Sequence, residues 1–458
     1  MPRQYLAPSA LLTSRWADNV LIEVADDGLI TETTANRFSA GAERLKGPII
    51  PGMANVHSHA FQRAMAGLTE KGGPQGDSFW AWRDLMYRFV ERLTPDDVEA
   101  IATQLYIEML EAGYTAVGEF HYLHHDPQGK PYANPVEMAE RIRAASTTVG
   151  IGLTLLPVLY AHSNFGDRSP TPGQRRFIND SERFCAMLEA LAPTLRGDPL
   201  HRLGVAPHSL RAVSPDELRR TLTFAENLDN SMPIHIHAAE QQKEVADCIA
   251  WSGAPPVQWL LDHVEVDRRW CVIHATHMRA GETSALARTG AVVGLCPTTE
   301  ADLGDGLFNA RPYLQFEGKF GIGGDSHVGV DPFLELRLFE YGQRLQHEQR
   351  NVLSFTPGES LGGVLYRRAS SGGAQALGQA AGVIAPGFRA DWIVLREHDV
   401  ALAGQRHDGL LDMAIFGPAR VPVRDVIVGG VWQVRDGAHP HARAAAQRYR
   451  ATLKRLLA

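Results

Sequence analysis

The chain has 458 residues, of which 44% are hydrophobic and 21% charged, the balance of a globular protein of enzyme size. A formal net charge of −7 and the lack of basic clusters argue against nucleic-acid binding. No apolar run approaches the roughly 20 residues of a membrane span, no export signal opens the chain, and the four cysteines show no disulfide-framework or CxxC spacing. We expect a cytoplasmic protein with reduced thiols, without a nucleic-acid or membrane partner.

Both ends of the chain contain segments that alternate in polarity as β-strands do. Residues 20–24 and 29–34 are separated by an Asp-Asp-Gly turn. Residues 391–395 and 426–434 are also strand-like, with a Gly-Gly turn inside the second segment. Neither end alone is large enough for a core, so we predict that together they form one small composite β-domain.

The middle, residues 51–375, alternates short apolar runs with helical patterns such as 95–112 and 215–228, as parallel β/α units do. The predicted strands are 52–57, 115–119, 152–157, 203–206, 233–237, 271–274, 291–295 and 320–325. Eight units fit a (β/α)8 TIM-type barrel, whose active site lies at the C-terminal strand ends. The predicted fold is therefore α/β, this barrel with a β-sandwich domain from residues 1–50 and 376–458.

Side chains that bind metals follow several of these strands. His57 and His59 end the first strand, where the two-residue period points both imidazoles to one face. The fifth strand ends with His237, the sixth with His274 and the eighth with Asp325. Any one of them could be an ordinary polar group at the barrel rim. Five imidazole and carboxylate groups at one barrel mouth instead indicate a metal-dependent hydrolase.

The chain resembles the amidohydrolase superfamily over nearly its whole length. The matching segments are residues 52–59, 235–240, 272–274 and 323–326, together with the tail at 382–391 that returns to the β-domain. The resemblance implies the barrel-plus-sandwich fold, a hydrolytic activity on C–N bonds and a homodimer.

A mononuclear site is favoured. Binuclear amidases of the superfamily commonly bridge two metals with a carboxylated lysine, and no lysine of this chain ends a central strand; Glu119 is the only obvious carboxylate substitute. The resemblance assigns His57, His59, His237 and Asp325 to one Zn²⁺ per subunit, although such N/O ligands accept other divalent metals.

The same resemblance suggests how water is activated. Zinc lowers the pKa of bound water to about 7. Asp325 and His274 take up its proton and orient the nucleophile, while Glu240, three residues after His237, protonates a nitrogen of the substrate. Glu240 could instead be a carboxylate favoured at a helix start. His235, deeper on the face of His237, is expected to be a core histidine or to support the ligands.

The loops after the strands resemble those of the deiminases that convert N-formimino-L-glutamate to N-formyl-L-glutamate and ammonia in histidine degradation. This resemblance rests on residues 56–63, 79–83, 119–124 and 206–213. A substrate with two carboxylates requires arginine, hydroxyl, imidazole or amide donors. The candidates are Gln62, Arg83, Tyr122, His208 and Arg211.

Several alternatives stay open at this point. Arg83 could be a surface arginine of a helix, and Tyr122 could simply pack; a glycine-rich loop at 67–76 could close over the site. A deaminase of guanine, cytosine or an adenosine derivative such as S-adenosylhomocysteine would use the same metal site, but would need aromatic stacking more than carboxylate-binding groups. A binuclear cyclic amidase lacks its lysine. A silent scaffold has no use for Glu240 beside metal ligands.

Overall fold

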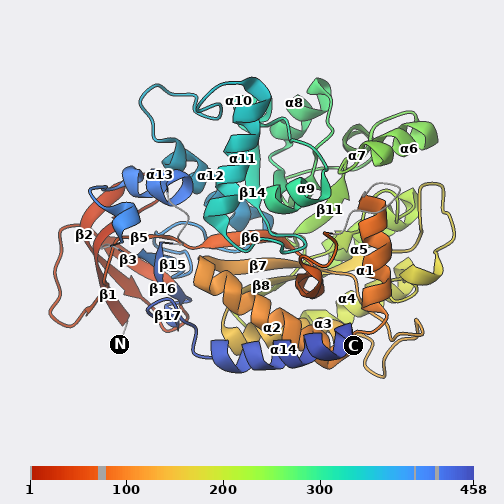
Figure 1. Cartoon of the computed structure of the whole chain (residues 1–458), viewed down its shortest axis with the longest axis horizontal. Helices are drawn as coiled ribbons and strands as arrows, with labels where there is room; N and C mark the ends of the chain where they lie inside the picture. The colour runs from red at the N-terminus through yellow and green to blue at the C-terminus, as the bar shows by residue number, and fades with distance from the viewer. Residues whose placement is uncertain (1–2, 71–78, 397–398, 418–421) are drawn as a thin grey trace.

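The computed structural model of the chain describes residues 3–70, 79–396, 399–417 and 422–458. Figure 1 shows a β-barrel surrounded by helices and, at one side, a sheet in which the first and last strands of the chain lie together. The predicted fold class, a TIM-type barrel with a small β-domain built from both termini, is confirmed.

The barrel strands are all parallel. Their order is β10-β8-β7-β6-β14-β13-β12-β11, with β9 also on β8. Isolated parallel bridges from Val205 to Ile234 and from Ser209 to His237 close the ring between the fourth and fifth positions. The strands are β6 Met53–Ser58, β7 Tyr114–His121, β8 Gly152–Leu159, β9 His201–Leu203, β10 Ala206–Pro207, β11 Ile234–Ala238, β12 Trp270–His274, β13 Val292–Leu295 and β14 Lys319–Ile322.

The fourth barrel strand differs from the prediction, because the predicted strand 203–206 is divided into β9 and β10. At the break, the backbone N–H of Gly204 donates to Leu155 O on one side, and that of Val205 donates to Pro233 O on the other. A Cβ on Gly204 would lie 2.5 Å from Cδ2 of Leu156. The chain thus passes too close to its neighbour for a regular strand, and only glycine fits there.

Helices cover the outside of the barrel. α2 and α5 have the predicted bounds, and each begins with a capping box and a proline in its first turn. The helices of this layer are α1 Phe79–Val90, α2 Pro95–Ala112, α3 Glu137–Val149, α4 Ser181–Leu195, α5 Pro215–Leu228, α6 Gln242–Ser252, α7 Pro256–His263, α8 Ala280–Thr289, α9 Pro297–Leu303, α10 Ala310–Gln315, α11 Pro332–His347 and α12 Leu361–Ala376, with the short 3₁₀ helices η1 Ala60–Met65 and η2 Pro172–Gln174.

The second sheet interleaves the two ends of the chain in the order β17-β16-β15-β5-β1-β2-β3, with β4 on β1. β15 is antiparallel to both β5 and β16 and so joins the two ends. Tyr5 packs edge-on against the fully buried Trp392, with ring centroids 5.2 Å apart. The strands are β1 Arg3–Leu11, β2 Trp16–Val24, β3 Ile30–Thr34, β4 Glu43–Arg44, β5 Ile49–Pro51, β15 Trp392–Leu395, β16 Val423–Val428 and β17 Val431–Val434.

The last helix leaves this sheet and returns to the barrel. After η3 Val400–Leu402 and α13 Asp408–Phe416, the chain ends in α14 Ala442–Leu457, which lies along α2 (Figure 1). The Tyr449 hydroxyl donates to the carbonyl of Arg63 in η1 at 3.3 Å, and Arg92 donates to Leu456 O at 2.6 Å. The C-terminal helix is therefore bonded to η1 and to the segment that follows α1.

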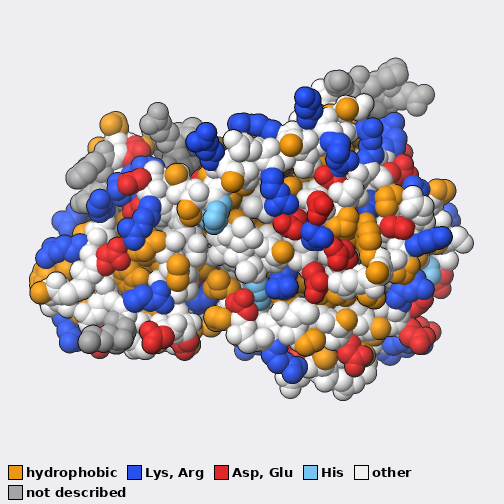
Figure 2. Space-filling view, turned by 90° about the horizontal axis from the view of Figure 1, so that it is seen from below, with side chains coloured by type: hydrophobic (Ala, Val, Ile, Leu, Met, Phe, Trp, Pro, Cys, Tyr) orange, Lys and Arg blue, Asp and Glu red, His pale blue; other side chains and the backbone are white. Residues whose placement is uncertain are grey.

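The surface carries charges of both signs. Figure 2 shows Lys and Arg side chains interspersed with Asp and Glu over one face, with apolar side chains scattered among them. No helix in the described part of the chain has both the length and the apolar character needed to cross a membrane.

Candidate active site

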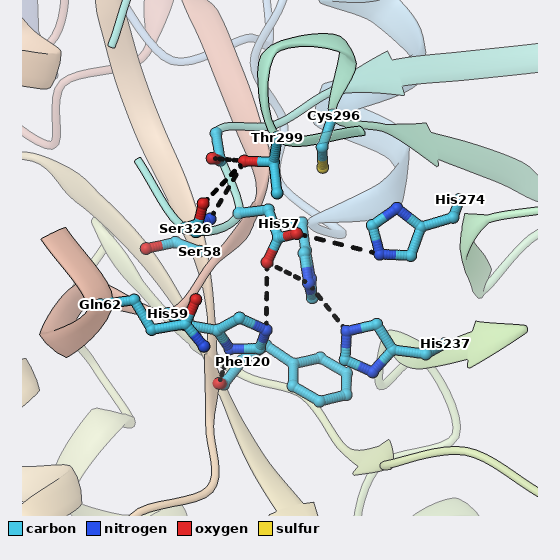
Figure 3. Close-up of polar contacts among 12 residues, drawn as sticks. His57, Ser58, His59, Gln62, Phe120, His237, His274, Cys296, Thr299 and Ser326 are labelled. Carbon is cyan, nitrogen blue, oxygen red and sulfur yellow. Dashed lines mark hydrogen bonds and ion pairs between the residues drawn. The ribbon is translucent and has the colours of Figure 1, made fainter. Parts of the chain in front are cut away.

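Three histidines and one aspartate meet at the C-terminal mouth of the barrel. His57 lies on β6, His59 just after it, His237 on β11 and Asp325 shortly after β14, and all four are buried. The Nε2 atoms of His57 and His237 are 3.0 Å apart. Oδ1 of Asp325 lies 3.5 Å from Nε2 of His57 and 3.3 Å from Nε2 of His59. Figure 3 shows the imidazoles of His57, His59 and His237 directed toward one another.

This geometry fits one divalent metal ion. Ligands about 2.1 Å from a tetrahedral ion lie roughly 3.4 Å from one another. Nδ1 of His59 faces Phe120 O at 2.9 Å, and Nδ1 of His237 faces His208 O at 3.0 Å. Because a carbonyl oxygen only accepts, both Nδ1 atoms carry the proton, and each Nε2 offers its lone pair to the ion.

The protonation states of the ligands also suit a metal. Burial, with His59 nearby, lowers the pKa of His57 to about 3, so its imidazole is neutral. Burial by itself would raise the pKa of Asp325, but the hydrogen bond with His57 and the electrostatic interaction with the neighbouring histidines outweigh it and hold that pKa below its ordinary value. Neutral imidazoles and an ionised carboxylate are the forms that bind a cation.

Left-handed backbone conformations turn the chain sharply after three of the barrel strands. Ala239 follows β11 with φ 55°, His274 ends β12 with φ 68°, and Asp325 follows β14 with φ 48°. Residues with a Cβ seldom adopt this region, and such residues cluster at functional sites. Here they direct the side chains that follow the strands into the barrel mouth.

His274 lies among three carboxylates. Its Nε2 is 3.8 Å from Oε1 of Glu240 and 3.9 Å from Oδ2 of Asp325, and its Nδ1 is 3.2 Å from Oε1 of Glu300. Burial alone would lower the pKa of His274, but the three acids raise it to about 10. Burial raises the pKa of Glu240 to about 7, despite His274 nearby. One imidazolium and one carboxyl that can exchange a proton at neutral pH thus adjoin the candidate metal ligands.

Glu240 belongs to this site although it stands just before α6. The turn at Ala239 takes it off β11, and its backbone N–H donates to Oε2 of Glu244 at 3.0 Å. Its carboxylate faces His274 and, at 3.8 Å, the guanidinium of Arg211. The structure therefore places the side chain at the barrel mouth and not at the helix terminus.

A cavity beside His59, His237 and Asp325 has an empty volume of about 540 Å³, which includes space open to solvent. Its lining includes all the residues predicted to bind substrate, namely Gln62, Arg83, Tyr122, His208 and Arg211. The glycine-rich loop predicted at 67–76 runs into residues 71–78, which lie outside the described part of the chain.

Hydrogen bonds and ring contacts hold three of these residues in place. Nε2 of Gln62 donates to the hydroxyl oxygen of Tyr122 at 2.7 Å, which leaves the phenolic proton for another acceptor. Nδ1 of His208 lies 2.9 Å from Oγ of Ser209, and its ring centroid is 4.9 Å from that of His237. A ligand beside the metal would meet the Tyr122 hydroxyl and the His208 imidazole.

The two arginines lie in different surroundings. The Arg211 side chain is 7% exposed, and its closest carboxylate oxygens, on Glu240 and Glu244, are 3.8 and 3.9 Å away. Its Nε has no hydrogen-bond partner among the described residues. Arg83, on α1, is half-buried, with its guanidinium carbon 5.5 Å from the ring centroid of Tyr87. Both cations line the same cavity.

Two residues weighed as extra ligands have other partners. Glu119 accepts hydrogen bonds from Oγ of Ser58 at 2.5 Å and from the hydroxyl of Tyr106 at 3.1 Å. It therefore supports the β6 end and faces α2. Nε2 of His235 donates to Ala376 O at 2.8 Å in the core, as expected for a histidine below the site.

The sequence reasoning missed Glu300. Its Oε1 accepts from the backbone N–H of Cys296 at 2.9 Å and contacts Nδ1 of His274. Glu300 is not at a strand end but one helical turn beyond the seventh strand, in the first turn of α9. Its position in the first turn of the helix that follows that strand is the only signal in the sequence.

Comparison with known proteins places the site in a family. Residues 49–432 match the Amidohydrolase family. The chain is 51% identical to formimidoylglutamate deiminase of Pseudomonas aeruginosa, over 98% of this chain and 99% of the relative, and 27% identical to 8-oxoguanine deaminase of the same organism, over 98% of both. A crystal structure of an amidohydrolase from Brucella melitensis superposes with a TM-score of 0.94, at 50% identity and full coverage of both chains. The chain belongs to the amidohydrolase family.

Proposed function

We propose that this protein hydrolyses N-formimino-L-glutamate to N-formyl-L-glutamate and ammonia, as a deiminase of histidine degradation. One observation carries the proposal: a single cavity joins the histidine–aspartate cluster to two arginines and to imidazole, amide and phenol donors. The 51% identity to a formimidoylglutamate deiminase supports it.

We propose that His57, His59, His237 and Asp325 hold one zinc ion per subunit, because three imidazoles and one carboxylate suit zinc. Such an ion lowers the pKa of a bound water molecule to about 7, which supplies hydroxide at neutral pH.

Three residues, Glu240, His274 and Asp325, take part in the proton transfers of the reaction. Glu240, with its pKa near 7, donates a proton to the imino nitrogen as water adds to the formimino carbon. Asp325 accepts the proton that the attacking water loses. His274, with its pKa raised to about 10, already carries a proton, so it does not take up this one as the sequence suggested; it lies 3.9 Å from Oδ2 of Asp325 as a positive charge. The amino group of the adduct takes up that proton and departs as ammonia, while the adduct hydroxyl returns its proton to Glu240 as the formyl C=O forms.

The cavity supplies partners for both carboxylates of the substrate. Arg211 and His208 lie next to Glu240 and His237, so they adjoin the reacting group. Arg83, on α1, lines the same cavity. Guanidinium groups bind carboxylates through paired, charge-assisted hydrogen bonds, which favours a small acid over an uncharged base.

An alternative, deamination of a nucleobase or adenosine derivative, has one observation in its favour. Trp82, Tyr87, Tyr160 and Phe177 give the cavity an aromatic lining on which a base could stack. Two arginines in the lining are the stronger observation, because guanidinium groups pair with carboxylates, which a neutral base lacks. We further propose a cytoplasmic homodimer with no nucleic-acid or membrane partner.

Ammonia release tests the proposal. The purified protein, with its metal content measured, is incubated with N-formimino-L-glutamate and, in parallel, with guanine, 8-oxoguanine, cytosine and S-adenosylhomocysteine. We expect ammonia from the formimino acid only and one metal per chain. Ammonia from a base but none from the formimino acid would establish the alternative, and two metals per chain would rule out the mononuclear site.

A further inference from the structure

Gln174, at the end of η2, holds the hydroxyl groups of two tyrosines. Its Nε2 donates to the hydroxyl oxygen of Tyr160 at 2.9 Å and to that of Tyr87 at 3.3 Å, while its Oε1 accepts from the backbone N–H of Thr171 at 2.8 Å. Because a backbone N–H only donates, the amide atom facing it must be the oxygen. Both phenol oxygens therefore accept from Gln174.

Each phenol proton is thus left for another acceptor. Even if one tyrosine donates to the other, at least one O–H of the pair remains, and no carboxylate or carbonyl within the described residues accepts it at hydrogen-bond distance. Buried hydroxyls ordinarily have an acceptor. An acceptor brought by a ligand would complete this arrangement.

The segment before Gln174 packs closely against Tyr87 and fixes the position of the Gln174 amide. Gln174 is 1% exposed. A Cβ on Gly173 would lie 2.9 Å from Cδ2 and 3.0 Å from Cβ of Tyr87, so only glycine lets the backbone lie against that side chain. The Thr171 cap further fixes the turn. The amide is therefore held in one orientation, with all of its hydrogen-bonding groups in use.

Tyr87 and Tyr160 both line the substrate cavity, on a part of its wall away from the metal ligands. The rings of His237, His208 and Tyr160 follow one another, with centroids 4.9 and then 4.4 Å apart, so Tyr160 is two rings removed from the ligand. Tyr87 lies beside Arg83 on α1, and both line the cavity. Phenol donors next to a guanidinium form an environment suited to a carboxylate.

We propose that Tyr87 and Tyr160, oriented by Gln174, donate hydrogen bonds to the substrate carboxylate that is remote from the scissile C–N bond. The pair then selects the γ-carboxylate of a glutamate derivative over shorter or monocarboxylic analogues. Gln174 is a positioning residue and does not touch the substrate. This inference rests on the proposed deiminase function and names the residues that set its specificity.

Two substrates separate this role from a structural one. N-formimino-L-glutamate is compared with N-formimino-L-2-aminobutyrate, which keeps the α-carboxylate but lacks the γ-carboxylate. In Tyr87→Phe, Tyr160→Phe and Gln174→Met, we expect kcat/KM for the dicarboxylate to fall roughly 10- to 100-fold, mainly through KM. For the monocarboxylate we expect no change. Tyr341→Phe, at a tyrosine stacked on Phe416 outside the cavity, is the matched control and should affect neither substrate.

Gln174→Glu tests the direction of the hydrogen bonds. A carboxylate accepts from the two phenols instead of donating to them, so it removes their protons from the substrate while preserving the shape of the side chain. We expect at least the loss in kcat/KM seen for Gln174→Met, with unchanged metal content and unfolding temperature. Wild-type kcat/KM in this variant would overturn the inference.

The inference and the proposed function fail in different ways. If the wild-type protein releases no ammonia from N-formimino-L-glutamate, the proposed function is wrong. If the wild type is active but the tyrosine variants lose activity equally on both substrates, or on neither, the specificity role is wrong and the function stands.

Discussion

Oε1 of Glu240 faces Nε2 of His274 across the barrel mouth at a distance of 3.8 Å. The two groups shift each other toward the charged pair, while burial keeps the carboxyl able to hold a proton near neutral pH. Glu240 thus contacts His274 and is not itself one of the candidate metal ligands. Its role as a proton donor can therefore be tested without removing a ligand.

Replacing Glu240 with Gln should reduce kcat by roughly 10²- to 10⁴-fold, the range for loss of a general acid or base. The amide keeps the shape of the side chain but cannot deliver a proton at neutral pH. Metal content should stay at the wild-type level, because Glu240 is not among the ligand atoms. Steady-state kinetics with metal analysis checks both, with the exposed Glu265→Gln as control. Near-normal kcat would remove the acid role.

Replacing Arg211 with Met should raise KM and lower kcat/KM roughly 10- to 100-fold, the effect of losing a charged hydrogen-bond partner. Arg211 is the cation between Glu240 and Glu244, so its loss also removes one positive charge from beside two buried carboxylates. Arg211→Lys keeps the charge but loses the planar fork, and should be intermediate. The measurement is kcat/KM of the wild type and of both variants on N-formimino-L-glutamate. An unchanged kcat/KM in the Met variant would contradict a carboxylate-binding role.

Metal removal should lower both activity and the unfolding temperature. The ligands are neutral imidazoles and a carboxylate held together by the fold, and an ion that binds only the folded state stabilises it by about 4 kcal/mol at a free concentration of 1,000 times Kd. Dialysis against a chelator, then addition of zinc, is followed by calorimetry and ammonia release. We expect both properties to return together. His59→Gln should bind less metal and show less of this shift; an equal shift would exclude His59 as a ligand.

The clustering of the candidate metal ligands could be predicted from the sequence because these residues follow strands. His57, His237 and Asp325 each lie at or just after the end of a parallel strand, and parallel strands place such residues at one barrel mouth. The tyrosine pair could not be found in this way. Tyr87 lies on a helix and Tyr160 follows β8, and they meet only through an amide from a loop.

In the fold too, elements set by local sequence patterns could be predicted, whereas those that depend on tertiary contacts could not. α2 and α5 were predicted with their observed bounds because their capping residues are local. β1 was missed because Pro8 lies in its middle and lacks an N–H for the ladder. In the structure the pairing passes from Ala7 to Ser9 without Pro8, opposite Asn19 with φ 50°. A local irregularity in both strands thus accommodates the proline. The residue pattern of one strand alone does not reveal this irregularity, because it involves the partner strand.

Glu119 should contribute to stability more than to the chemical step. Its carboxylate accepts from Oγ of Ser58 at 2.5 Å, from the N–H of Ala60 at 2.7 Å and from the hydroxyl of Tyr106 at 3.1 Å. Glu119→Leu leaves the buried N–H of Ala60 and the hydroxyl of Tyr106 without an acceptor, whereas Ser58 keeps Nε2 of His327, 2.9 Å from its Oγ, as a partner. At about 1–3 kcal/mol for each unpaired donor, we expect the free energy of unfolding to fall by about 2 kcal/mol or more. Glu119→Gln keeps one acceptor oxygen and should lose less.

Denaturant unfolding of the two Glu119 variants, each with metal bound, tests whether the Leu variant loses more stability than the Gln variant. The β6 end that Glu119 holds carries His57 and His59, so weaker metal retention should accompany the loss of stability in the Leu variant. In the fraction that keeps its metal, kcat should stay close to the wild-type value, because the carboxylate faces α2 and not the cavity. A Leu variant as stable as the wild type, or one with full metal and no activity, would contradict a supporting role.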